Sequence, residues 1–292
     1  MPTIKLYLKF LIIVFIIVSC SGDSDNSDNS KKSKNPDQID NIDLSDKLGL
    51  DSGEVKMFTM PTPLQTAAAL KIMGVDYDDH LLLKNGNITS DSDIDLSLAL
   101  GMYMVDLGYT TIYNNNQKSL SYAQDIQSIM DELPISYYVN DEFRKRFKEN
   151  IDNQDTLCKI ILQGYNDANQ YISETENEGM GILILTGSYI EGFYLISSAD
   201  INTKWKNEYD NLFIQQKLFL DNFIMLLNNY TGNEKIKAVV QNLELLKEAF
   251  DEVNIYFNSD KEAYEMKRPI SQKTKEKMKT IISKIRKDMT VS

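Results

Sequence analysis

The chain has 292 residues, 42% of them hydrophobic and 25% charged, and its formal net charge is −12 at pH 7. This length and apolar content suit one large globular domain, or two small ones, with a hydrophobic core. Because nucleic acids are polyanions, so acidic a chain disfavours DNA or RNA as a partner.

The first residues have the layout of a signal peptide. Lys5 and Lys9 give a positively charged start, and the stretch that follows, residues 10–18, is the unbroken apolar run FLIIVFIIV. Its length falls within the ~7–15 residues of a signal-peptide core and well short of the ~20 that span a bilayer. The run therefore predicts an export signal.

The sequence Ile17-Val18-Ser19-Cys20, at the end of this run, resembles the lipobox of bacterial lipoproteins. The resemblance implies that residues 1–19 are a signal peptide removed before Cys20, and that Cys20 then carries fatty-acyl chains such as palmitate. Each buried methylene contributes ~0.8 kcal/mol, so two or three chains hold a protein on the lipid bilayer almost permanently. An ordinary secretory leader with a chance cysteine, or an uncleaved anchor, is the alternative.

A polar segment separates the predicted anchor from the rest of the chain. Residues 20–38 are rich in Ser, Asp, Asn and Lys, and we expect them to form a flexible tether after the lipidated Cys20. Ser21 rather than aspartate follows the cysteine, which in the lipoproteins it resembles favours delivery to the outer membrane of a Gram-negative envelope, facing the periplasm or the cell surface. We expect residues 39–292 to form a single all-helical domain.

Helix signals dominate this domain and strand signals are nearly absent. The fold class expected is all-α: a multi-helix bundle or an irregular α-solenoid of helical hairpins after a disordered tether. The helices are predicted at Pro63 to Gly74, Ser90 or Ser92 to Ile112, Asn115 to Leu133, after Asn140, Asp155 to Ile172, Met180 to Ser198, Asn202 to Asn228, Lys235 to about Phe257, and Ser271 to Asp288.

Small residues recur on one face of two of these helices. Gly101 and Gly108 lie seven apart on the first helix, and Gly181, Ser188 and Gly192 lie seven and four apart on the second. A mid-helix glycine costs up to ~1 kcal/mol against alanine, and a close approach of two backbones is a reason to keep it. The spacing predicts that the two helices cross tightly near the domain centre.

The same two helices each carry one carboxylate inside an apolar segment. Asp106 lies in VDLG and Glu191 in IEGF. Each carboxylate is expected either at a wet helix edge, paired with a tyrosine or a lysine, or lining a pocket for a polar ligand. The tyrosines that offer hydroxyl groups to such a pocket are Tyr103, Tyr109, Tyr113, Tyr189 and Tyr194.

Other catalytic patterns fail. His80 is the single histidine, so a Ser-His-Asp triad or a zinc site with two histidines would be hard to assemble. The acidic run at residues 91–95 has Leu96 where a calcium-binding EF-hand loop needs glycine, so we expect no metal site. No cofactor motif is found. The sequence around Cys158 reads as a helix face, which predicts a buried, inert thiol.

The end of the chain is basic although the protein is acidic. The segment Lys261–Ser292 contains ten Lys and Arg against four Asp and Glu, a net charge of +6. One interpretation is a basic amphipathic helix docked on the acidic body, with Met278, Ile281, Ile282 and Ile285 inward. The other is a surface for anionic lipid headgroups or for another envelope partner.

Part of the chain is similar to a group of helical lipoproteins of Gram-negative envelopes whose function is uncharacterised. The likeness covers residues 57 to about 230 and is carried by MFTMPTPLQTAAALKIMG, LALGMYMVDLGYTTIYNNNQKSL, NIDNQDTLCKII and LILTGSYIEGFYLI, including an LGxYxxDLxY helix. The resemblance implies a helical fold and a lipid anchor, and it supplies no catalytic residues.

Two functions remain open at this point. The first is a non-enzymatic, membrane-anchored envelope lipoprotein whose helical domain acts as a scaffold or binds an envelope protein or a small ligand. The second is a hydrolase-like enzyme that uses Asp106 and Glu191 together with the tyrosines. The second requires both carboxylates within about 10 Å of each other, facing one cavity.

Overall fold

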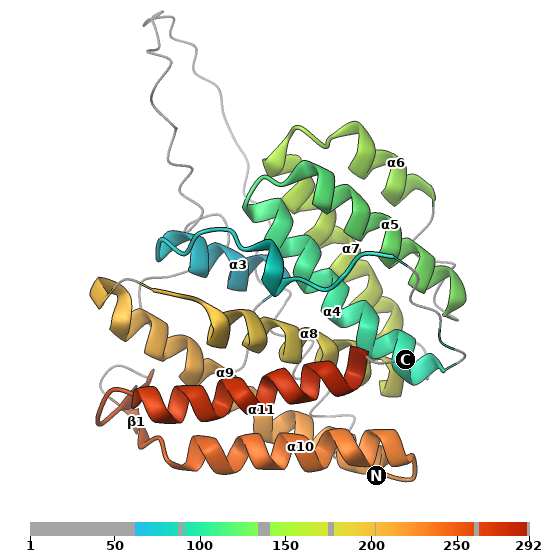
Figure 1. Ribbon diagram of the computed structural model, residues 1–292. Helices are drawn as coiled ribbons and strands as arrows, with labels where there is room; N and C mark the ends of the chain where they lie inside the picture. Colours follow the sequence, from blue (N-terminus) through green and yellow to red (C-terminus); the bar gives the residue numbers. More distant parts are fainter. Residues whose placement is uncertain are drawn as a thin grey trace, which may run out of the picture.

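The computed structural model of the protein describes residues 62–86, 90, 92–133, 141–174, 178–201, 203–259 and 263–290 (Figure 1). The predicted signal peptide, the lipidation site Cys20, the tether and residues 39–61 lie outside the described residues.

The described residues are predominantly helical, which confirms the all-α fold class. Three short 3₁₀ turns, η1 to η3, connect some of the helices; they are Asp79–Leu81, Thr203–Trp205 and Asn228–Tyr230. The α-helices are α3 Pro63–Ile72, α4 Asp93–Ile112, α5 Asn116–Glu132, α6 Asp141–Glu149, α7 Gln154–Glu174, α8 Glu178–Ser198, α9 Lys206–Leu227, α10 Glu234–Asp251 and α11 Gln272–Thr290.

Local sequence accounts for several of the helix ends. At the start of α3, Thr62 and Gln65 form a reciprocal capping box, in which each side chain accepts from the other residue's backbone N–H. Asn115 and Asn233 cap α5 and α10 without a reciprocal bond, because in each case only the asparagine side-chain oxygen accepts from backbone N–H groups of the first turn. Gly74 has a φ of 77°, a left-handed conformation that glycine adopts without strain, and it turns the chain just beyond α3.

The helices form a bundle around α4 and α8. In Figure 1, α3, α4 and α8 occupy the middle of the molecule, α5, α6 and α7 lie on one side, and α9, α10 and α11 lie on the other. Helix α8 contacts α3, α4, α7, α9 and α11, so the helices surround a common centre. One continuous hydrophobic core receives side chains from every helix between α3 and α11. This arrangement decides for a bundle over a row of stacked hairpins.

Helix α8 is the most apolar of these helices. Among the described residues, Gly179–Ser198 is the single segment long and apolar enough to cross a membrane, judged by length and composition alone. Of that segment, 78% is buried inside the bundle. Its apolar character is thus accounted for by the neighbouring helices that enclose it.

A β-hairpin follows α10, where the sequence predicted helix. Helix α10 ends at Asp251 rather than at Phe257, and strands β1, Ile255–Asn258, and β2, Ala263–Met266, pair in antiparallel fashion. Residues 255–257, Ile-Tyr-Phe, are β-branched or aromatic, which favours extended structure once a pairing partner is present. That partner lies beyond a turn, so helical periodicity alone misplaced the end of α10.

Candidate functional site

Helices α4 and α8 cross at a point where two glycines leave the backbones bare. A Cβ atom added to Gly101 would lie 1.9 Å from a backbone carbonyl oxygen of α8, and one added to Gly187 would lie 2.0 Å from a carbonyl oxygen of α4. The Ser188 hydroxyl donates to the Gly101 carbonyl oxygen over 3.1 Å. Any side chain at the two glycines would force the helices apart.

The residues predicted for this crossing divide between two contacts. Gly101 and Ser188 lie at the crossing itself. Gly108 and Gly192 instead face α3: a Cβ at Gly108 would be 2.9 Å from the backbone of that helix, and one at Gly192 would be 3.8 Å from its nearest side chain. Gly181 is buried near the start of α8. The spacing of small residues correctly identified the closely packed faces of α4 and α8. Part of each face contacts α3, which packs against both helices, and not the other helix of the crossing.

The crossing brings together the two carboxylates that the sequence singled out. The side chains of Asp106 and Glu191 are both 0% exposed. Arg286, from α11, grips Glu191 in a bidentate pair, with Nε donating to Oε2 over 2.6 Å and an amino group donating to Oε1 over 2.7 Å. The Leu83 backbone N–H donates to Asp106 Oδ2 over 2.8 Å.

The two carboxyl groups lie close enough to affect each other's ionisation. Burial, and next the charge of Glu191, raise the pKa of Asp106 well above its usual range. Burial also raises the pKa of Glu191, while Arg286 opposes that shift. The second oxygen of Asp106, Oδ1, has no hydrogen-bond partner among the described residues. These directions favour a neutral Asp106 beside an ionised Glu191 whose charge Arg286 neutralises.

A connecting segment, residues 75–86, closes over the cluster. Arg286 donates to the Leu81 carbonyl oxygen over 2.9 Å. The hydroxyl of Tyr122 donates to the Leu83 carbonyl oxygen over 2.5 Å, and that of Tyr103 donates to the next carbonyl, of Lys84, over 2.7 Å. Side chains at the cluster thus bond backbone groups of a segment that, apart from η1, has no regular secondary structure.

The remaining predicted tyrosines take different places. Tyr109 accepts from the Asp78 backbone N–H over 3.1 Å, so it binds the same 75–86 segment farther along. Tyr194 stacks on the guanidinium of Arg286, 4.1 Å from its ring centre to the guanidinium carbon. Tyr189 is separate, because its hydroxyl donates to a backbone carbonyl of α9 over 3.2 Å.

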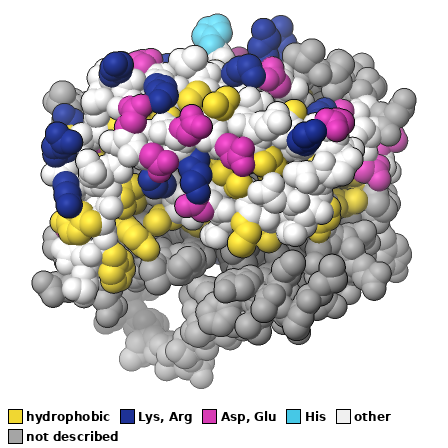
Figure 2. Space-filling model, turned by 90° about the horizontal axis from the view of Figure 1, so that it is seen from below, with side chains coloured by type: hydrophobic (Ala, Val, Ile, Leu, Met, Phe, Trp, Pro, Cys, Tyr) yellow, Lys and Arg dark blue, Asp and Glu magenta, His cyan; other side chains and the backbone are white. Residues whose placement is uncertain are grey.

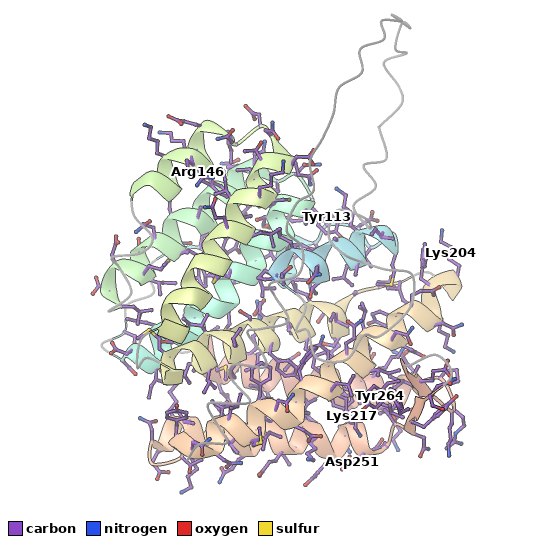
Figure 3. The ribbon with its side chains drawn as sticks, turned by 180° about the vertical axis from the view of Figure 1, so that it is seen from behind. Tyr113, Arg146, Lys204, Lys217, Asp251 and Tyr264 are labelled. Atoms are coloured by element: carbon purple, nitrogen blue, oxygen red, sulfur yellow. The ribbon has the colours of Figure 1, made fainter. Side chains whose placement is uncertain are left out.

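Tyr113, also named from the sequence, lies at the far end of α4. Its hydroxyl donates to the Val75 carbonyl oxygen over 2.7 Å, at the start of the 75–86 segment. Figure 3 shows its side chain beside α3, where Lys71 lies 5.7 Å from its ring centre. Of the five predicted tyrosines, Tyr103 and Tyr194 reach the carboxylate cluster, and Tyr109 and Tyr113 fasten the other end of the segment.

Sequence reasoning missed Arg286, the residue that completes the cluster. A signal for it was present: the buried face of α11 is formed by Met278, Ile282, Ile285 and Met289, and position 286 lies four after 282 and three before 289. An arginine on an apolar helix face needs an anionic partner inside the protein. The partner, Glu191, lies 95 positions earlier in the chain, which is why no local pattern could pair them.

A second buried ion pair fastens the other end of α11. Asp210, 0% exposed, pairs with Lys275 and accepts from the Ile270 backbone N–H over 3.2 Å. The ammonium of Lys275 also lies 4.6 Å from the ring centre of Tyr209. Helix α11 is therefore held to the bundle by two buried carboxylates, one near each of its ends.

Other side chains considered from the sequence are not part of this cluster. His80 lies in η1, and its backbone N–H donates to the Asp78 side chain. Cys158, on α7, is partly buried, and burial raises the pKa of its thiol to about 11. Among the described residues, no three His, Cys, Asp or Glu side chains are placed to hold a metal ion.

Comparisons with known proteins do not extend this picture. No family model matches the chain, and neither the curated proteins nor the solved structures include a significant match. The arrangement must be interpreted from its own chemistry. Its carboxylates are enclosed and bonded to a guanidinium and a backbone N–H, so its chemistry is that of an internal clamp joining the 75–86 segment, α4, α8 and α11.

Proposed function

We propose that the protein is a lipid-anchored lipoprotein of the bacterial envelope whose helical body serves as a non-catalytic scaffold or binding module. The observation that carries the non-catalytic half is the burial of Asp106 and Glu191. They lie near enough to affect each other's ionisation, as the hydrolase-like alternative required, yet both are 0% exposed, Glu191 is paired with Arg286, and Asp106 accepts from the Leu83 backbone N–H. A general acid or base has to reach the substrate, and these carboxyl groups are committed to the protein itself.

The anchor half of the proposal rests on the sequence alone. The run at residues 10–18, the sequence Ile17-Val18-Ser19-Cys20 and the polar stretch that follows are the order expected of an acylated, tethered protein. The partners proposed are the lipid bilayer, reached through acylated Cys20, and an envelope protein or a small ligand bound by the helical body. The location proposed is the outer membrane.

The chain supplies its own control for a test of the anchor, because it contains exactly two cysteines. Cells that express the protein are fed an alkyne-bearing palmitate analogue, and the purified chain is examined for label. We expect label on the wild type and on Cys158→Ala, and none on Cys20→Ala, which should also leave the membrane fraction on washing with alkaline carbonate. An unlabelled wild type, or a Cys20→Ala variant that stays equally membrane-bound, refutes the anchor.

The non-catalytic half is tested with Asp106→Asn, which keeps the size of the side chain and removes its acidity. Asparagine can still accept from the Leu83 N–H and donate to Glu191, so the fold should persist. A scaffold or binding protein with this substitution should complement deletion of its own gene as well as the wild type does. Loss of complementation with the variant folded and present at normal levels would favour the hydrolase-like alternative.

A further inference from the structure

The β-hairpin presents aromatic side chains to solvent. Tyr256 is 39% exposed and Phe257 47% exposed, and the Phe257 ring meets Tyr264 of the opposite strand edge-on, with ring centres 5.2 Å apart. At the base of the hairpin, Ile255 and Met266 pack against the hydrophobic core. The base is thus fixed to the bundle while the rings farther along β1 are left uncovered.

Two basic side chains directly after the hairpin form no ion pair within the part of the chain that the structure describes. Lys267 and Arg268 are exposed, and neither forms an ion pair with any described residue. This differs from the nearby lysines of α11, because Lys275 pairs with Asp210, and Lys277 pairs with Glu252 at 2.7 Å. Two positive charges therefore remain available beside the exposed rings.

The acidic residue of β2, Glu265, is hydrogen-bonded within the hairpin and is not paired with Lys267 or Arg268. Glu265 stands opposite Tyr256 in the strand register and accepts from its hydroxyl over 2.7 Å and from the Asn258 amide over 3.0 Å. Figure 1 places the hairpin at the left end of the α10–α11 pair, and the view from below in Figure 2 shows hydrophobic side chains gathered next to Lys and Arg at that end.

We propose that this hairpin docks the helical body on a bilayer surface rich in anionic lipid. Tyrosine and phenylalanine side chains partition into the interface between headgroups and acyl chains, and lysine and arginine are attracted to the lipid phosphates. The inference rests on the proposed function in one respect: an acyl anchor at Cys20 keeps the body beside a membrane.

The geometry of the hairpin favours lipid over a protein partner. Tyr256 and Phe257 are successive strand residues, so their side chains leave opposite faces of the ribbon. A rigid protein surface covers one face of such a ribbon, whereas the headgroup layer surrounds an inserted hairpin on both. The adjoining charges of Lys267 and Arg268 suit a layer of lipid phosphates, because phosphates attract cations without a precise arrangement of partner groups.

The test uses one tryptophan as a depth probe in the full, anchored chain. The chain contains a single tryptophan, Trp205, which is replaced by phenylalanine so that Phe257→Trp or Leu245→Trp becomes the sole emitter. Leu245, on α10, is 48% exposed and is the matched control for Phe257. Each chain is reconstituted into vesicles of phosphatidylcholine with brominated acyl chains, with or without 30% phosphatidylglycerol, where ~30% is a membrane-like anionic content.

In the anionic vesicles we expect strong quenching and a blue shift for tryptophan at 257, and neither for tryptophan at 245. Neutralising the cations with Lys267→Gln and Arg268→Gln should lower the ratio of docked to undocked protein about 30-fold. This factor corresponds to a loss of about 1 kcal/mol of membrane attraction for each of the two basic residues.

Each other outcome overturns the inference. Equal quenching at 257 and 245 means that the anchor alone brings the body to the bilayer. Absence of quenching at 257, or quenching unaffected by the two neutralising substitutions, removes lipid as the occupant and leaves a protein partner. Failure of the anchor itself is distinguished by co-sedimentation, because a chain without acyl groups does not pellet with the vesicles in high salt.

Discussion

Replacing Arg286 by methionine tests whether the buried cluster holds the fold together. Methionine keeps most of the length of the side chain and removes the two hydrogen bonds to Glu191, the one to the Leu81 carbonyl and the stacking on Tyr194. Glu191, 0% exposed, would be left without a counter-charge. Removing one partner of a buried ion pair destabilises a protein by ~3–5 kcal/mol.

The effect is large against the ~5–15 kcal/mol that stabilises a typical domain. With a urea dependence of ~2–3 kcal/mol per molar, the midpoint of unfolding should fall by about 1–2 M. The assay is urea unfolding followed by the helical circular-dichroism signal. Lys287→Met, at the next position on the exposed side of α11, is the control and should change the free energy of unfolding by less than ~0.5 kcal/mol.

A second substitution separates loss of the pair from loss of packing. In the double variant Arg286→Met with Glu191→Met, no buried charge is left uncompensated, so the loss should be clearly smaller than the sum of the two single losses. The reasoning is refuted if Arg286→Met alone costs no more than Lys287→Met, or if the two single losses simply add.

Three further predictions concern the glycines, the ionisation of Asp106 and the thiol of Cys158. Gly101→Ala should lower the free energy of unfolding by more than ~3 kcal/mol, because its Cβ would lie 1.9 Å from a backbone oxygen, whereas Gly192→Ala, with 3.8 Å of room, should be tolerated or gain up to ~1 kcal/mol; thermal unfolding of both variants measures the difference. For Asp106 the folded pKa is raised, so its proton stabilises the native state fully below the unfolded pKa of ~3.9, and this contribution is lost as pH rises toward the folded pKa. Asp106→Asn should therefore become progressively more stable relative to wild type as the pH of the urea titration rises above the unfolded pKa, and a constant difference would contradict a raised pKa for Asp106. With its pKa near 11, Cys158 should react with iodoacetamide at pH 8 about two orders of magnitude more slowly than a free thiol, as followed by mass spectrometry; urea should abolish the difference.

The helices and their order could be predicted because their signals are local. Thr62 before Pro63, Asn115 before α5 and the apolar spacing of α8 each fix structure within a few residues. Where the secondary structure of a segment depends on pairing with residues farther along the chain, the local sequence pattern predicted it wrongly. Residues 255–257 read as the end of a helix, since the strand they pair with begins at residue 263, beyond a turn.

The same limit applies to the candidate site. The sequence marked Asp106 and Glu191 as carboxylates in apolar surroundings, and glycine spacing indicated that their helices cross. The sequence did not predict that Arg286, from the last helix, would pair with Glu191. It also did not predict that backbone carbonyls of the 75–86 segment would accept hydrogen bonds from Tyr103 and Tyr122. Tyr103 was predicted to offer its hydroxyl to a ligand, and the bond that it forms is to the protein's own Lys84 carbonyl group.

Two buried ion pairs fix the position of α11 along its own axis, which hydrophobic packing alone does not. Lys275 and Arg286 are three turns apart on α11, about 16 Å at 1.5 Å per residue, and each meets a fully buried carboxylate. Apolar residues recur along α11 every three or four positions, so a slide of one turn would still bury apolar side chains. It would bring Ile282 or Thr290 to the place of Arg286, and neither can neutralise Glu191. Because an uncompensated buried charge is costly, positions of α11 shifted by one turn are disfavoured. The two ion pairs therefore define the position of α11 on the bundle, and Arg286 also bonds the 75–86 segment through the Leu81 carbonyl.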